Sequence, residues 1–168
     1  MNTQEFKAFC HELFLKYGFV KVKNMYYLNC HELLCGIYLQ RSIAAAYYVE
    51  LDFFIGDYND KKSYPSMYFS DMHRRIAVPS KCQGCDGNYF MDACIEYELY
   101  TKEEIEPYFV DVLEQYVVPL KTQGKKYIME NQDFYLKAVF KHQIEDVLKK
   151  LGQVTIRTDQ SGDGSMVE

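Results

Sequence analysis

The chain has 168 residues and a formal net charge of −5, with 48% hydrophobic and 26% charged residues. This length and balance suit one soluble domain whose core needs neither disulfides nor a metal to fold. No run of Lys and Arg is dense enough for nucleic-acid binding, and no apolar run approaches the about 20 residues that cross a bilayer. The N-terminus lacks the basic start of a signal peptide, so we expect a cytoplasmic protein whose cysteines are reduced thiols.

The chain begins with a pattern typical of an amphipathic helix from about residue 3 to residue 17. Asn2 followed by Glu5 resembles a capping box, and Gly18 is placed to end the helix. Between them, apolar residues recur at three- and four-residue steps: Phe6, Phe9, Cys10, Leu13, Phe14 and Tyr17. Such a stripe predicts a helix with one buried face.

Three strands are predicted next. The segment 19–28 mixes aromatic residues and valines with lysines, which favours a strand near the edge of a sheet. The runs 33–39 and 45–55 each alternate in the pattern of a half-buried strand, and their succession predicts an antiparallel pair. Their apolar positions are Leu33, Cys35, Ile37, Leu39, Ala45, Tyr47, Val49, Leu51, Phe53 and Ile55.

Two further strands are predicted after a polar loop at 56–63. Residues 73–78 have the composition of a short strand, and residues 93–100 alternate again. Between them, residues 80–88 are rich in Gly, Cys and Asp, which predicts a loop. The segment 64–70 fits no single type of element.

Helical patterns return in the last third of the chain. Thr101 and Glu104 form a second capping box, and an apolar stripe continues from there to Leu120. Pro107 lies far enough inside this stripe that we expect a kink or a restart of the helix. A third helix is predicted over residues 131–152.

The order of these elements predicts an α+β fold. A single domain, residues 1–152, would contain a mostly antiparallel sheet of about five strands with an N-terminal helix and two C-terminal helices. Residues 153–168 are polar and rich in Ser, Gly and Asp, so we expect a mobile tail.

The polar positions of the strands supply a candidate binding surface, made of Tyr38, Gln40, Tyr48, Glu50, Asp52, Glu96 and Glu98. Tyrosine offers a large contact area at low entropic cost, and carboxylates attract cationic partners. This face would therefore bind a protein partner, with a basic one favoured. The simpler alternative is a solvated sheet face, or one covered by a helix, which is routine in antiparallel sheets.

Cys82 and Cys85 form the most motif-like element, a Cys-x-x-Cys pair with Gly84 in its turn. Two thiolates at this spacing can bind one Zn²⁺, but a structural site needs four ligands and the chain has no second such pair. We favour two loop cysteines without a metal and no cofactor, and keep a zinc site as the alternative. No histidine stands at a recognisable spacing from a nucleophile, and no phosphate-binding, dinucleotide-binding or metalloprotease motif occurs, so an enzyme is disfavoured.

One stretch resembles a family of small uncharacterised bacterial domains of unknown function. The resemblance rests on Gly18-Phe19 after an amphipathic helix, a Lys-rich strand with aromatic residues, and Leu39-Gln40-Arg41-Ser42 before an extended strand over 48–56. It covers residues 5–56 and implies a helix, a short antiparallel sheet and C-terminal helices, with no catalytic residues. In size and charge, the chain is also similar to immunity proteins that neutralise bacterial toxins.

The sequence therefore favours a non-enzymatic cytoplasmic module that binds another macromolecule, in the manner of an immunity protein. One alternative is a small-ligand binder or enzyme with an aromatic pocket between sheet and helices. In that case, buried carboxylates or His73 should converge on a concave site. The other alternative is a structural zinc module. The oligomeric state is left open by the sequence.

Overall fold

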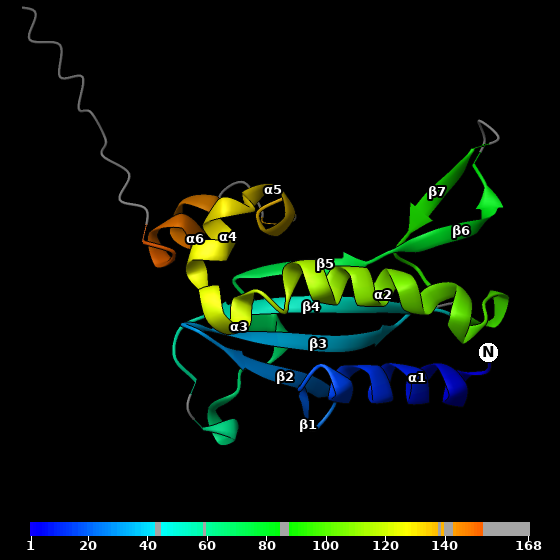
Figure 1. The fold of residues 1–168 in the computed structure, drawn as a ribbon, viewed down its shortest axis with the longest axis horizontal. Coiled ribbons are helices and arrows are strands. Elements are labelled where there is room, and N and C mark those ends of the chain that lie inside the picture. The colour runs from blue at the N-terminus through cyan, green and yellow to red at the C-terminus, as the bar shows by residue number, and fades with distance from the viewer. Residues whose placement is uncertain (43–44, 59, 85–87, 138, 140–142, 153–168) are drawn as a thin grey trace, which may run out of the picture.

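The computed structural model describes residues 1–152 except 43–44, 59, 85–87, 138 and 140–142, so the tail predicted at 153–168 lies outside the described residues. The fold is α+β, as predicted, with an N-terminal helix, a five-stranded antiparallel sheet and C-terminal helices (Figure 1). The elements are α1 (Thr3–Lys16), β1 (Val20–Val22), β2 (Met25–Cys30), β3 (Leu33–Arg41), β4 (Tyr47–Ile55), η1 (Lys61–Ser63), η2 (Met67–Phe69), β5 (Met72–Ile76), β6 (Val78–Gln83), β7 (Tyr89–Asp92), η3 (Tyr97–Leu99), α2 (Lys102–Tyr116), α3 (Leu120–Gln123), α4 (Lys125–Glu130), α5 (Gln132–Tyr135) and α6 (Ile144–Lys150).

The five strands follow one another in the sheet in the order β1-β2-β3-β4-β5, each antiparallel to its neighbour. The two alternating runs are the central strands β3 and β4, whose pairing extends from Leu33 opposite Ile55 to Arg41 opposite Tyr47. Since a period of two fixes which side chains share a face, this register confirms the predicted parity of both strands.

The single strand predicted at 19–28 is a hairpin instead. β1 and β2 are joined by a tight turn at Lys23 and Asn24, and Lys23 adopts a left-handed backbone conformation with φ 57°. A lysine rarely takes this conformation, so the turn carries no clear sequence signal. β1 is an edge strand, as its lysines indicated.

Two further predictions about the middle of the chain are wrong. The loop predicted at 80–88 starts too early, because residues 80–83 belong to β6, which pairs with β7 in a separate two-stranded hairpin. In the strand predicted at 93–100, only Ile95 pairs with a strand, opposite Tyr47, and the chain then turns into η3. The alternation there has another cause, because Tyr97 packs on Phe6 of α1 with ring centroids 5.5 Å apart.

The C-terminal part is helical as predicted, but it is divided differently. α2 runs through Pro107 without a restart, and this proline is exposed, so solvent can bind the carbonyl that it leaves unpaired. The long helix predicted over 131–152 is instead the two short helices α5 and α6. Asn131, with φ −126° and ψ 41°, separates α4 from α5.

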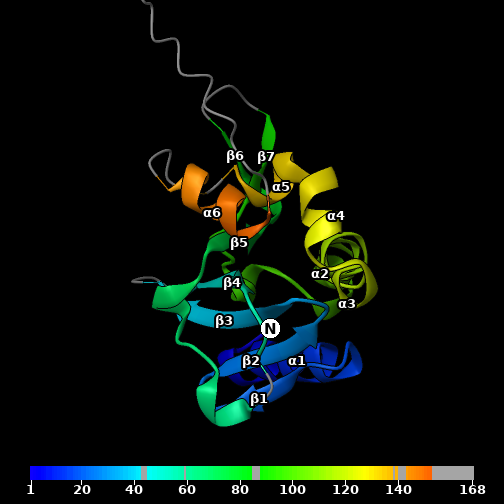
Figure 2. The same cartoon turned by 90° about the vertical axis from the view of Figure 1, so that its left-hand side faces the viewer.

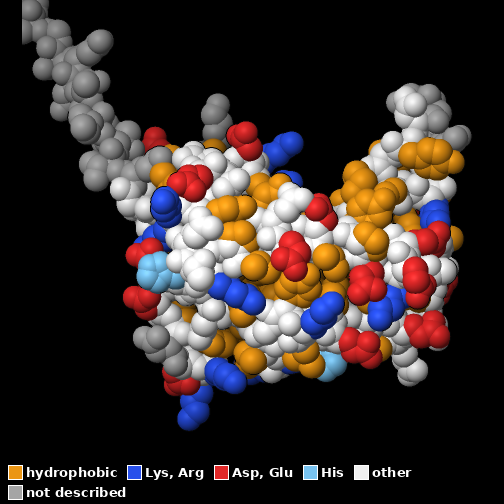
Figure 3. Space-filling model, in the orientation of Figure 1, with side chains coloured by type: hydrophobic (Ala, Val, Ile, Leu, Met, Phe, Trp, Pro, Cys, Tyr) orange, Lys and Arg blue, Asp and Glu red, His pale blue; other side chains and the backbone are white. Residues whose placement is uncertain are grey.

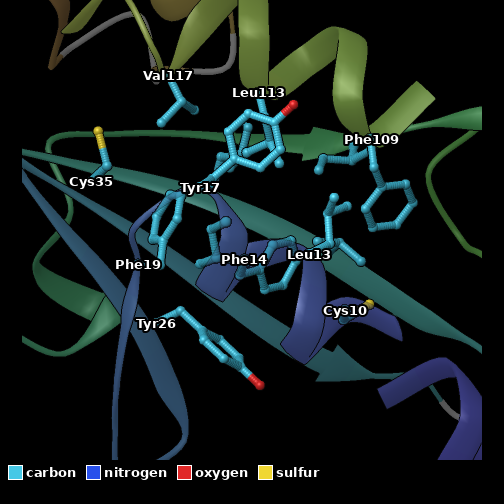
Figure 4. Close-up of a cluster of buried hydrophobic side chains, with 14 of the residues drawn as sticks. Cys10, Leu13, Phe14, Tyr17, Phe19, Tyr26, Cys35, Phe109, Leu113 and Val117 are labelled. Carbon is cyan, nitrogen blue, oxygen red and sulfur yellow. The ribbon is translucent and has the colours of Figure 1, made fainter. Parts of the chain in front are cut away.

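The main core lies between the sheet and helices α1 and α2. Figure 4 shows Leu13 and Phe14 of α1 and Phe109 and Leu113 of α2 pointing into this cluster. The apolar positions of β4, such as Val49, complete it from the sheet side. This face of the sheet is therefore mostly buried, as the alternation predicted, although Leu39 and Ile55 at its ends are half-buried. Ala45 is an exception, since it precedes β4 and is exposed.

The opposite face of the sheet is partly buried as well. The connection between β4 and β5, which contains η1 and η2, lies on the other side of the sheet from α1 and α2 (Figure 2). Beneath it is a second cluster of buried side chains, made of Met25, Tyr27, Leu34 and Phe54, against which Tyr58, Tyr64 and Met67 pack. The described residues of this β4–β5 connection, 56–58 and 60–71, therefore cover this face of the sheet.

Candidate functional site

The five polar positions predicted on β3 and β4 do share one face, but their carboxylates are not exposed. Tyr38, Gln40 and Tyr48 are half-buried, whereas Glu50 is 5% exposed and Asp52 is 1% exposed. The exposed position expected for these two carboxylates is wrong, because the β4–β5 connection and Arg75 cover this face. Neither Glu50 nor Asp52 can therefore meet a partner directly.

Glu50 is neutralised within the protein. Across the β4–β5 pairing, Arg75 holds its Oε1 with two donors, Nη2 at 2.8 Å and Nε at 2.9 Å. The guanidinium also lies 4.1 Å from the ring centroid of Tyr48. Hydrogen bonds between an ionised guanidinium and a carboxylate are stronger than neutral ones, and the aromatic contact fixes the arginine further. Two of the predicted site positions, Glu50 and Tyr48, are therefore engaged by Arg75 within the fold.

We expect Arg75→Ala to lower the free energy of unfolding by about 2–3 kcal/mol, because it leaves the buried Glu50 without its cation. The double variant Glu50→Gln/Arg75→Ala should recover most of this loss. Urea unfolding followed by circular dichroism gives both values. As a control, Lys126→Ala breaks the exposed pair with Glu130 and should cost under about 0.5 kcal/mol. If the single and double Arg75 variants lose the same free energy of unfolding, the ion pair between Glu50 and Arg75 does not account for the loss.

Asp52 is the most perturbed carboxyl group on this face. Its removal from water raises its pKa to about 7, the nearby charge of Glu50 adds to the rise, and a hydrogen bond with Ser70 opposes it. Oδ2 is buried and makes no hydrogen bond among the described residues. Gly36 lies opposite Asp52 in the β3–β4 pairing, and a side chain at this position would be crowded. An added Cβ would lie 3.1 Å from side-chain atoms of both Met25 and Phe54.

Asp52 and its cross-strand neighbour His73 do not reproduce the enzyme-like arrangement considered from the sequence. The two residues face each other in the β4–β5 register. Neither lines any of the cavities described below, so this pair offers no concave site where a substrate could reach both groups.

Glu96 and Glu98, the other two predicted site residues, are exposed but lie away from the sheet face. They flank Tyr97 on η3, next to the start of α1, where the Met1 ammonium group donates to the carbonyl oxygens of Tyr97 and Tyr100. They belong to a longer acidic stretch, residues 96–116, which we call the acidic end. It holds seven of the 24 Asp and Glu residues and one of the 19 Lys and Arg residues. The negative balance of the chain is thus concentrated there.

The hairpin of β6 and β7 projects from the body of the protein next to the acidic end (Figures 1 and 3). We call it the aromatic arm, because it leaves Tyr89, Phe90 and Met91 exposed by 66%, 47% and 55%. It is joined to α2 by an ion pair between Lys81 and Glu104, and to the end of η3 by the hydroxyl group of Tyr100, which donates to the carbonyl of Pro79 at 2.8 Å. Neighbouring apolar side chains exposed in this way are typical of interaction sites.

Cys82, one of the two predicted zinc ligands, lies exposed on β6 of the arm, whereas Cys85 lies outside the described residues. Within the described part of the chain, His, Cys, Asp and Glu side chains form no group of three that could hold a metal ion. No observation on these residues favours the zinc alternative over the others.

A basic cavity was not anticipated by the sequence analysis. A pocket of about 650 Å³ lies between the β1–β2 hairpin and the β4–β5 connection, and it is lined by Lys21, Lys23, Lys61 and Lys62. A second groove of about 610 Å³, on the other side of the same hairpin, adds Lys7 and Arg41. Tyr38 lines both. These cations come from separate segments, so no local sequence pattern could have revealed them.

Comparison of the chain with protein-family models, with curated proteins and with solved structures finds no match. Among the described helices, none is both long enough and apolar enough to span a membrane. Only the surfaces and cavities of the described residues therefore indicate a function.

Proposed function

We propose that the protein is a non-enzymatic cytoplasmic module that binds a basic protein, as an immunity protein binds its toxin. The observation that carries the proposal is the aromatic arm, with its three exposed apolar side chains beside the acidic end. Aromatic and methionine side chains form the centres of protein interfaces, and surrounding charges select and steer the partner. The cytoplasmic setting is supported by the free thiols of all five described cysteines.

The charges next to the arm favour a foreign partner over a second copy of this chain. In a twofold dimer the same patch meets itself, so the acidic end of one copy would approach that of the other. Six of its carboxylates are exposed and only Glu106 is half-buried. Like charges brought together across an interface cost free energy, whereas a lysine- or arginine-rich surface would gain.

The proposal is tested by photo-crosslinking in the source organism with benzoylphenylalanine at position 90 of the arm. The matched control carries it in place of Leu15, which is 46% exposed on α1. We expect one basic protein to be captured from position 90 and not from position 15. The captured protein is then purified and its Kd measured by calorimetry, so that direct binding is established independently of the cell.

In that measurement, Phe90→Ala should weaken binding at least about tenfold, as expected for a side chain at the centre of an interface. Glu96→Gln/Glu98→Gln/Glu103→Gln should weaken it mainly at low salt. Glu12→Gln/Asp57→Asn/Asp133→Asn changes the net charge equally at scattered exposed positions and should have little effect. If the two crosslinker positions capture the same proteins, or if neither surface variant affects the Kd, the proposed surface is wrong.

A further inference from the structure

We propose that the pocket between the β1–β2 hairpin and the β4–β5 connection, the lysine pocket, binds a nucleotide. Its volume of about 650 Å³ lies in the range of small-molecule sites. Four lysines line it and no Asp or Glu does. This site is separate from the aromatic arm and does not depend on the protein-binding function proposed above.

The lysines point to an anion because nothing in the pocket balances them. Lys21 and Lys23 come from the hairpin, and Lys61 and Lys62 from η1. Asp60, the nearest carboxylate in sequence to η1, does not line the pocket, since its side chain caps η1 by accepting from the backbone N–H of Lys62 at 3.0 Å. Lysine ammonium groups gathered around one cavity repel one another unless a counter-charge is present, and phosphate groups supply it.

The neighbouring groove extends the positive field. It shares Lys21 and Lys23 with the lysine pocket and adds Lys7 and Arg41, again with no Asp or Glu in its lining. Six cations thus surround the hairpin of a chain whose net charge is −5. Such a local concentration of one sign draws anions to the hairpin in spite of the overall charge.

The rings of the pocket point to a planar group on the same ligand. Tyr27 and Tyr64 pack with centroids 4.8 Å apart, and their hydroxyl groups donate to the Pro65 carbonyl at 2.6 Å and to Asn29 Oδ1 at 3.0 Å. These two rings are therefore held in place. Tyr68, at the edge of the same pocket, is 87% exposed. Its ring does little for the fold and is free to stack on a base, as aromatic side chains do in nucleotide sites.

The turn at the tip of the hairpin has two central residues, and the first of them needs a positive φ. Lys23 occupies the left-handed conformation, with φ 57°, although Asn24 beside it belongs to a residue type that tolerates this conformation better. The turn places a lysine at the tip of the hairpin, between the two basic grooves.

A single nucleotide fits better than an extended nucleic acid. Outside the acidic end, the chain carries 17 Asp and Glu residues against 18 Lys and Arg residues, so a long polyanion would leave the basic grooves for a surface with no net attraction. A nucleoside diphosphate places its charges within one pocket and its base within reach of Tyr68.

The test is calorimetric titration of the full chain with ADP, adenosine and inorganic tripolyphosphate at low salt. We expect ADP to bind most tightly, tripolyphosphate more weakly and adenosine weakest, because the lysines and the exposed ring act together. The affinity for ADP should fall as salt is raised. Hexauridylate, a short single-stranded RNA, is titrated in parallel and should bind no more tightly than ADP.

Two variants separate the contributions. Lys61→Ala/Lys62→Ala should weaken ADP binding about tenfold or more, since both exposed lysines would contact phosphate. The matched control, Lys125→Ala/Lys126→Ala on α4, removes the same charge far from the pocket and should leave affinity unchanged. Tyr68→Ala should weaken ADP about fivefold and leave tripolyphosphate binding unaffected. Its control is Tyr89→Ala on the arm.

Several outcomes would overturn the proposal. Absence of ADP binding at millimolar concentration would rule out the site. Equal losses in the α4 control variant would show that only net charge matters. If tripolyphosphate binds as tightly as ADP and Tyr68→Ala has no effect, the pocket binds phosphate groups alone and no base stacks on Tyr68. Hexauridylate binding far more tightly than ADP would make the hairpin a nucleic-acid surface instead.

Discussion

Asp52→Asn is expected to stabilise the protein at pH 8 by about 1–3 kcal/mol and to remove much of the dependence of stability on pH between 4 and 7. Burial raises the pKa of Asp52 to about 7 in the folded protein, whereas an unfolded aspartate titrates near 4. The folded state therefore binds the proton more tightly. The stabilisation that this proton provides is fully present below the pKa of the unfolded aspartate. It is lost as the pH rises through the pKa of the folded state, and the loss is about 4 kcal/mol at most.

The gain from the substitution should be smaller than this limit, because an amide brings two N–H donors into a site where Oδ2 already lacks a partner. Urea unfolding at several pH values between 4 and 9 measures the effect. Asp57→Asn, an exposed change in the nearby connection, is the control and should leave the pH profile unchanged. Parallel profiles for Asp52→Asn and the unaltered protein would contradict the assignment of this titration to Asp52.

The same protonation should affect the β4–β5 connection locally. This segment covers Asp52 and the buried cluster of Met25, Tyr27, Leu34 and Phe54. Ionisation of Asp52 makes the covered state less favourable, so hydrogen-exchange protection of residues 56–71, corrected for intrinsic rates, should fall between pH 6 and pH 8. The connection also carries Lys61, Lys62 and Tyr68 of the lysine pocket, so its opening would alter that pocket too.

Periodicity in the sequence predicted the main elements that pack on the core. The stripe from Phe6 to Tyr17 became α1, and the alternation of β3 and β4 placed the correct side chains against the helices. Both patterns arise directly from burial on one side of an element, so they can be recognised in a single sequence. The hairpin at Lys23, by contrast, depends on one residue in an unfavoured conformation, which no periodicity records.

The candidate site was harder to predict because burial of the second sheet face depends on distant residues. The parity of Glu50 and Asp52 was right, but a polar position on a strand says nothing about what lies over it. Arg75 and the β4–β5 connection cover them, and neither is indicated by the local pattern. Conversely, the arm carries Tyr89, Phe90 and Met91 in succession. Three large apolar residues in a row favour a buried segment, but in the structure all three side chains are exposed.

The two proposed surfaces divide the charge of the chain between them. The acidic end carries the negative balance next to the aromatic arm, and the β1–β2 hairpin gathers six cations around its two grooves. The net charge of −5 indicates an acidic balance but locates neither surface, since positive and negative regions cancel in a sum. A basic protein and an anionic small molecule would thus approach different parts of the molecule, each along a favourable field.

Gly124→Ala is expected to be among the most destabilising single changes in this chain, with a loss of about 3–5 kcal/mol. Gly124 joins α3 to α4 with φ 53° and ψ −134°, a conformation that side chains rarely adopt. A Cβ there would lie 2.3 Å from the backbone carbonyl oxygen of His31, in the turn between β2 and β3. The backbone N–H of His31 also donates to the Leu120 carbonyl at 3.2 Å, so this contact docks the C-terminal helices onto the sheet.

Gly152→Ala separates the two causes of this loss. Gly152 also has a positive φ, of 92°, but an added Cβ would meet nothing within 4 Å. Its substitution should cost only the backbone term, about 1 kcal/mol. Thermal and urea unfolding of both variants give the comparison, and the excess loss in Gly124→Ala measures the steric contact with His31. If the two variants lose the same stability, the close approach of Gly124 to His31 does not contribute to the docking of α3 on the β2–β3 turn.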